Sequence, residues 1–253
     1  MRTRIFSTLA LLAAAAIPAV AQNPKSPKER EAVVAVMQAT TPEATIAAVD
    51  NLVSKFADTE FKAWALERAA ETEQKKGDLT KAMVYAERAA EADSKSLYGV
   101  QAMLLISGEL ARTTREFDLD KEEKLARSDK LAKEAMDNIG SAGKPGAQVT
   151  DEQWAGVKKD IAAEAHKDLG LGALARKKFD VAIAEFKLAV EGAATPDPAD
   201  MVRLASAYDQ AGQFDAAAPW LDKVINAPGM NQAIKNFALG EKKRNEEGKS
   251  GKK

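Results

Sequence analysis

Apolar residues recur at intervals of three and four along most of the chain, which is the spacing typical of amphipathic helices. The segment AMVYAERAA at residues 82–90 is one example. No proline occurs from Glu43 to Lys144, and no stretch shows sustained alternation of β-branched and polar residues. The pattern therefore predicts an all-α fold built from many short helices.

Capping residues, prolines and glycines indicate where these helices begin and end. Ser26-Pro27-Lys28-Glu29 has the form of a capping box with proline at the first helical position, and Asp120 with Glu123 has the form of another. The clearest loop is GSAGKPGAQV at residues 140–149. From these signals we predict helices over roughly 26–39, 41–57, 59–76, 80–92, 96–115, 120–140, 151–178, 180–191, 199–211 and 215–226, with a final helix from 231 that frays into the tail.

A pattern of five residues occurs three times in the sequence. Each copy has a turn residue, an apolar residue two positions later, and three further positions that share one helical face. The copies begin at Gly77, Lys177 and Gly212, and the last two are 35 residues apart. Helices of this length are marginal when isolated, so each is expected to pack against its neighbour in a hairpin.

This pattern resembles the tetratricopeptide repeat, a helix–turn–helix unit of about 34 residues. The resemblance is most specific in two copies, 163–195 and 198–230, and a third copy at 63–96 has Glu73 where the family has an aromatic residue. Residues 26–59 look like a degenerate copy, and the hairpin at 96–140 is too long for the consensus. The best-matched residues are Leu169, Gly170, Phe179, Ala182, Phe186 and Ala189 in the first copy and Leu204, Ala205, Tyr208, Gly212, Phe214 and Ala217 in the second.

The resemblance implies an α-solenoid of antiparallel helix pairs, with about five hairpins and a C-terminal capping helix. We divide the chain into an N-terminal helical-hairpin segment at 22–140, a loop at 141–150, a C-terminal repeat segment at 151–240 and a charged flexible tail at 241–253. The extra residues at 113–119 and the loop at 140–150 are expected to soften the junction between the two repeat segments.

The first 21 residues have the features of a secretory signal. Arg2 and Arg4 precede the apolar run Ile5–Val20, and Ala19-Val20-Ala21 supplies the small residues that a signal peptidase requires. We predict a Sec-type signal peptide (residues 1–21) cleaved after Ala21, and a periplasmic or secreted protein of an exported bacterial type, with no transmembrane segment after cleavage. An uncleaved N-terminal anchor is the alternative.

The composition excludes several kinds of chemistry. The chain has no cysteine and a single histidine, so disulfides, zinc-thiolate sites and cysteine nucleophiles are impossible. His166 is expected to be a packed or half-buried helix residue. Asp118, Asp120 and Glu122 alternate like calcium ligands, but the glycine and the final glutamate of an EF-hand loop are missing, and helix capping explains them better. We expect no enzymatic activity, no cofactor and no metal, and the net charge of −1 gives no sign of nucleic-acid binding.

In the tetratricopeptide family the first helices of the hairpins line a concave groove that holds peptides or partner helices. The Lys/Asn clamp for carboxyl-terminal peptides is not matched, because Leu171 stands where the clamp requires asparagine. For Trp64, packing between repeats is the alternative, and Trp154 and Trp220 are assigned to packing. The resemblance places eleven candidate partner-binding residues on the groove: Trp64, Glu67, Glu71, Gln74, Glu164, Lys167, Leu171, Leu174, Val202, Ser206 and Asp209.

The implied function is that of an exported adaptor or scaffold in the cell envelope, whose groove holds a segment of a protein partner. The alternative is a self-associating structural envelope protein or a binder of cell-wall polymer, and a homo-oligomer is left open.

Overall fold

The computed structural model describes residues 24–251, so the predicted signal peptide lies outside the described residues. Within this range the regular structure consists of eleven helices and no strand, which confirms the all-α prediction. The predicted helix ends mostly agree with the observed ones to within a few residues. The helices are α1 (Pro27–Gln38), α2 (Pro42–Lys55), α3 (Lys62–Lys76), α4 (Leu79–Ala92), α5 (Leu97–Thr113), α6 (Lys121–Ser141), α7 (Asp151–Ala175), α8 (Phe179–Gly192), α9 (Pro198–Gln210), α10 (Phe214–Ile225) and α11 (Gln232–Gly251).

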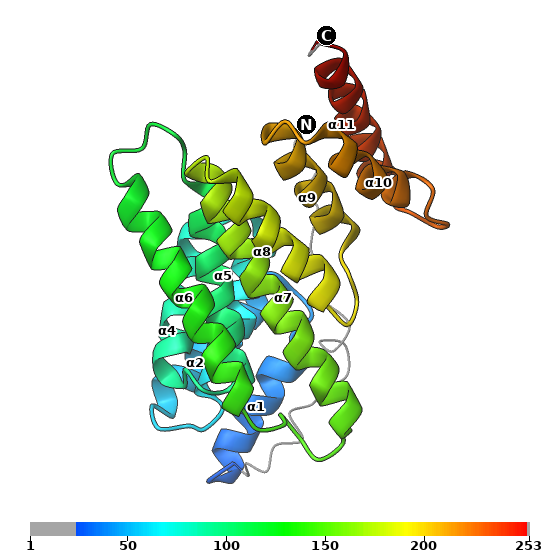
Figure 1. Cartoon of the computed structure of the whole chain (residues 1–253). Coiled ribbons are helices and arrows are strands. Elements are labelled where there is room, and N and C mark those ends of the chain that lie inside the picture. The colour runs from blue at the N-terminus through cyan, green and yellow to red at the C-terminus, as the bar shows by residue number, and fades with distance from the viewer. Residues whose placement is uncertain (1–23, 252–253) are drawn as a thin grey trace.

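Consecutive helices pack as hairpins, and the hairpins stack along the molecule (Figure 1). Five pairs form in this way, from α1 with α2 to α9 with α10, and α11 covers the last pair. The second helix of each pair also packs on the first helix of the next pair. This arrangement confirms the predicted α-solenoid of tetratricopeptide-like hairpins with a C-terminal capping helix.

The turn between the two helices of a hairpin has the same backbone conformation in three hairpins. Gly77, Lys177 and Gly212 have φ values of 89°, 58° and 72°, all in the left-handed region. In each turn the next residue donates its N–H to the carbonyl five residues earlier, at 2.8–3.0 Å. This is the Schellman arrangement, in which glycine is favoured because it has no Cβ. Lys177 adopts it at a steric cost.

Small residues occupy the positions where the two helices of a hairpin approach closely. Ala82, Ala182 and Ala217 have no exposed surface, as the repeat pattern predicted. At Gly170 in α7 even a methyl group does not fit, because a Cβ there would lie 2.8 Å from the ring of Phe186 in α8. The short side chains let α7 and α8 pack tightly around this ring.

Packing continues across the two segments predicted to be insertions. The α5–α6 connection spans residues 114–120, and the loop at 142–150 joins α6 to α7. Helix α7 nevertheless packs on both α5 and α6. The proposed division of the chain at 141–150 therefore stays a prediction about sequence segments, while the side-by-side packing of helices runs through it.

Two local predictions were wrong. Asp120 precedes α6 but its side chain makes no capping hydrogen bond, and it pairs with Lys124 at 2.9 Å instead. Ser26 does cap α1, but the Glu29 carboxylate accepts its hydrogen bond from the N–H of Lys25 rather than from that of Ser26. A complete capping box is found at Thr150, before α7.

The C-terminal segment also differs from the prediction. Residues beyond 240 were expected to be a charged flexible tail, whereas α11 continues to Gly251. Glu241 and Asn245 are buried on one face of this helix, and Asn245 donates to the backbone carbonyl of Phe214 at 2.8 Å. The ring of Phe214 lies against Gly248. These contacts hold the highly charged segment against the last hairpin.

Candidate partner-binding face

The candidate residues lie on first helices of the hairpins, and we call the surface of α3, α5, α7 and α9 that carries them the first-helix face. Helices α3, α5 and α7 contact one another in that order, and α9 contacts α11. Gln74 of α3 donates to Glu109 of α5 at 3.1 Å, and Asn245 of α11 donates to Asp209 of α9 at 2.5 Å. The predicted residues of α3 and α7 therefore lie on either side of α5, a helix from which no candidate was predicted.

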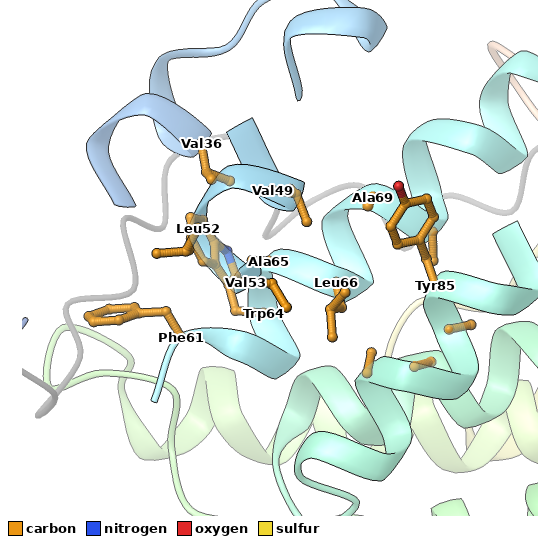
Figure 2. Close-up of a cluster of buried hydrophobic side chains, with 14 of the residues drawn as sticks. Val36, Val49, Leu52, Val53, Phe61, Trp64, Ala65, Leu66, Ala69 and Tyr85 are labelled. Atoms are coloured by element: carbon orange, nitrogen blue, oxygen red, sulfur yellow. The ribbon is translucent and has the colours of Figure 1, made fainter. Parts of the chain in front are cut away.

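Two of the predicted candidates are core residues. Trp64 is only 8% exposed and packs among apolar side chains of α2 and α3, with its ring edge-on to Phe61 at a centroid distance of 6.4 Å (Figure 2). Val202 has no exposed surface and belongs to the core of the last hairpin. Both side chains are buried, which for Trp64 agrees with the packing alternative, and their part in binding stays a prediction. Trp154 is buried and Trp220 partly buried in core clusters, as expected.

Four ion pairs on or beside this face form within a single helix. The same arrangement, an acid followed three residues later by a base, occurs on α5, α7, α9 and α11. In the first and last pairs the acid is buried and the base is largely exposed. In these two pairs the carboxylate is thus neutralised without a ligand, and the base lies at the surface. The four pairs are Glu109–Arg112, Glu164–Lys167, Asp200–Arg203 and Glu241–Arg244.

Lys167 differs from the other bases because it is buried. Burial acts to lower the pKa of its ammonium group, but the carboxylates of Glu164, Asp168 and Asp200 outweigh this effect and raise it. Asp168 is completely buried against α5, and burial raises its pKa, while the ammonium group of Lys167, 3.6 Å from its Oδ1, acts to lower it. A Cβ at Gly108 would lie 3.1 Å from its carboxylate. Lys167 is therefore part of an internal charge cluster that joins α5, α7 and α9.

The remaining candidates on α3 and α7 keep some exposure. Glu67 is half-buried, and its removal from water, followed by the nearby carboxylate of Glu71, raises its pKa to about 8. Leu171 and Leu174 are half-buried and pack partly against the core of α8 and α9. With Glu71 and Glu164 they make a face of mixed apolar and charged character. Their role in binding stays a prediction.

Two candidates on α9 line a cavity. Ser206 and Asp209 face a space of about 380 Å³ between α9, the start of α10 and α11, with Gln210, Phe214, Glu241 and Arg244 as the other lining residues. Glu241 and Arg244 were not predicted because the segment after 240 was assigned to a tail, and Gln210 and Phe214 were not among the candidates. The sequence did contain a signal that the helix continues past 240. Ala238, Glu241 and Asn245 have the three- and four-residue spacing of one helical face.

His166 lies at the contact between α7 and α8. It is half-buried, as expected, and its Nδ1 lies 2.7 Å from a carboxylate oxygen of Glu185, so that it links α7 to α8. In residues 24–251 no group of three or more His, Asp or Glu side chains is placed to hold a metal ion.

None of the helices described for this chain has both the length and the apolar content that crossing a membrane requires.

The last hairpin matches a known family. Residues 201–228, which cover most of α9 and all of α10, match the tetratricopeptide repeat. No curated protein matches the chain. A tetratricopeptide repeat suggests a protein-interaction adaptor or scaffold in general, and proteins built from such repeats are generally non-enzymatic.

Proposed function

Because the chain carries a tetratricopeptide repeat within a solenoid of helical hairpins, we propose that it is a non-enzymatic adaptor whose first-helix face holds a segment of another protein. The observation that supports this most directly is the continuous contact of α3, α5 and α7. A protein surface of this length suits an extended or helical segment, as in other groove-binding modes.

The chemistry of the face supports a protein segment as the ligand. Leu171 and Leu174 offer apolar contact, and the acids on α5, α7 and α9 already have bases three residues away. A ligand is therefore not required to be strongly charged. It gains by covering apolar surface while its polar groups bond to the flanking side chains.

We further propose that the adaptor works in the cell envelope. The support is in the sequence: a basic start, an apolar run and the small residues that end at Ala21. Expression of the full chain in a bacterial host, followed by cell fractionation and intact mass measurement, tests this. We expect a periplasmic product that starts at Gln22. A product that keeps residues 1–21 and stays in the cytoplasm would overturn the proposed location.

The binding function is tested by affinity capture from envelope extract with chain 22–253 as bait. The double variant Leu171→Glu and Leu174→Glu places two charges on the first-helix face. Leu188→Glu is the control, because Leu188 is 51% exposed and lies on α8, the second helix of the same hairpin. We expect a specific protein to be retained by the unmodified chain and by the control, and lost with the double variant. Equal retention by all three would contradict the proposed face.

A second candidate function, self-association, is favoured by one surface feature. Phe117 and Leu119 in the α5–α6 connection are 88% and 107% exposed. Backbone and side-chain hydrogen bonds of Asp118 with Arg115 hold this connection in a defined turn. Sedimentation velocity at increasing concentration tests it: self-association predicts larger species that disappear in the double variant Phe117→Ser and Leu119→Ser.

A further inference from the structure

Helix α8 leaves a line of apolar side chains exposed on its outer side. Its buried side packs on α7 and α9. On the opposite side Val181 and Leu188 are 49% and 51% exposed, and Ala184 between them is exposed as well. Residues three and four apart lie on the same face of a helix, so the three side chains form one stripe along α8.

This stripe distinguishes α8 from the other helices of residues 24–251. Helices α1 and α4 each expose one large apolar side chain. Helix α11 exposes two, Phe237 and Leu239, but residues two positions apart point to different sides of a helix. The pair on α8 is seven residues apart, which is close to two full turns.

A line of opposite charges runs beside the apolar stripe. Asp180 lies in the first turn of α8, Lys187 follows seven residues later, and both are exposed. Helical spacing places these two on one side of Ala184, and Val181 with Leu188 on the other. The outer side of α8 therefore has an apolar edge and a charged edge, and each edge is centred within one residue of Ala184.

We propose that α8 pairs with α8 of a second copy of this chain, antiparallel, about a two-fold axis at Ala184. This rotation brings Val181 of one copy against Leu188 of the other, and Asp180 against Lys187. Each contact occurs twice, as in other isologous interfaces. The small side chain of Ala184 lets the helices approach closely at the axis. The inference goes beyond the proposed function, because a dimer of this kind has two first-helix faces for partners.

Charge and symmetry favour a second copy, in this orientation, as the occupant. A parallel two-fold pairing would set the apolar edge of one copy against the charged edge of the other. In the antiparallel pairing one rotation satisfies both edges. Lys187 is available for it, because its pair with Glu191 within the helix is exposed and 3.8 Å long. A contact along one helix of 14 residues is small, so we expect a weak, reversible dimer.

Sedimentation velocity of chain 22–253 at increasing concentration tests the pairing. The unmodified chain should shift from monomer to dimer. Asp180→Lys and Lys187→Asp each set like charges against each other, and each should weaken self-association at least about tenfold. A mixture of these two variants should form a mixed dimer, because every charged contact then joins opposite charges. Asp137→Lys and Lys130→Asp are the matched controls: these exposed residues on α6 have the same spacing, with no exposed large apolar side chain beside them.

Three results would overturn the proposal. The unmodified chain could stay monomeric at all concentrations. The two charge-reversal variants could self-associate as the unmodified chain does, or they could fail to restore each other in the mixture. Because the controls on α6 change the net charge equally, an equal loss in these controls would also contradict a specific contact at α8.

A single cysteine tests the position of the axis. The chain has no cysteine of its own, so a disulfide formed by Ala184→Cys can join only two copies. Mild oxidation should give a crosslinked dimer on a non-reducing gel, and Ala126→Cys, at an exposed position on α6, should give none. Equal crosslinking of the two variants would contradict the proposed axis.

The outcomes separate this pairing from both candidate functions. Leu188→Glu should abolish the dimer while partner capture is retained, whereas the double variant at Leu171 and Leu174 should lose capture and keep the dimer. If the larger species disappear in the Phe117→Ser and Leu119→Ser double variant but persist in the charge-reversal variants, copies associate through the α5–α6 connection and the assignment to α8 is wrong.

Discussion

Gly170 gives the sharpest mutational test of how the hairpins pack. It lies in the interior of α7, where replacing glycine by alanine ordinarily stabilises a helix by about 1 kcal/mol. Here the new Cβ would lie 2.8, 2.8 and 3.0 Å from three atoms of the Phe186 ring. Phe186 has no exposed surface, so its ring cannot move toward solvent. Overpacking of this kind costs about 1–3 kcal/mol.

The two effects oppose each other, and the steric term is expected to dominate. Gly170→Ala should lower the free energy of unfolding by about 1 kcal/mol, and by up to about 2 kcal/mol if the ring cannot shift. Gly156→Ala is the matched control in the same helix, because its nearest neighbour is Ala194 Cβ at an ordinary 3.8 Å. That variant should gain about 0.5–1 kcal/mol.

Urea unfolding followed by far-ultraviolet circular dichroism measures both changes. The two alanine variants should move in opposite directions. Adding Phe186→Leu to Gly170→Ala should cost less than the sum of the two single changes, because the smaller side chain relieves the clash. If Gly170→Ala is as stabilising as Gly156→Ala, the close approach of α7 and α8 at this position is wrong.

Three further predictions concern the turns, the buried charge and the core. Lys177→Gly should raise the free energy of unfolding, measured in urea, by about 0.5 kcal/mol. Relief of the left-handed backbone strain at this position exceeds the loss of the exposed ion pair with Glu116. The control Lys178→Gly should give no such gain, because Lys178 has a φ of −89°. The raised pKa of Glu67 means that the folded chain keeps a proton that the unfolded chain loses, so part of the stability should be lost as the pH rises from its ordinary pKa of 4.5 to about 8. Glu67→Gln should remove that part and be about 1 kcal/mol more stable at pH 8 in chemical unfolding, and a steeper pH dependence in this variant would contradict the assignment. Trp64→Ala should cost about 3 kcal/mol or more, as for other buried aromatic residues, and a loss of partner capture at full stability would return Trp64 to the binding face.

The fold was predictable because its signals are local. Left-handed turns at Gly77 and Gly212 and the close helix crossing at Ala182 each depend on one small residue, which is visible in the sequence. The repeat spacing then identified the equivalent turn at Lys177, where the residue type alone gives no hint. The missing cap at Asp120 shows the limit, because a nearby lysine competes for its side chain.

The candidate site was less predictable because it depends on packing between distant segments. Helical spacing places Trp64 and Glu67 on adjoining positions of α3. Only the packing of α2 against α3 shows that Trp64 belongs to the hydrophobic core. The role of α5 was missed because its hairpin departs from the consensus length, although Glu109 bonds to Gln74. The cavity at Asp209 needs the C-terminal helix, whose charged composition resembles a flexible tail.

The central claim is that the first-helix face, and not the surface of the second helices such as α8, holds a different protein as partner. Site-specific photo-crosslinking in living cells tests it most directly, with a photoreactive amino acid placed either at Leu171 on α7 or at the exposed Leu188 on α8. We expect a crosslink to a different protein from position 171 and none to a different protein from position 188. Crosslinks from position 188 alone, or only between copies of this chain, would contradict it.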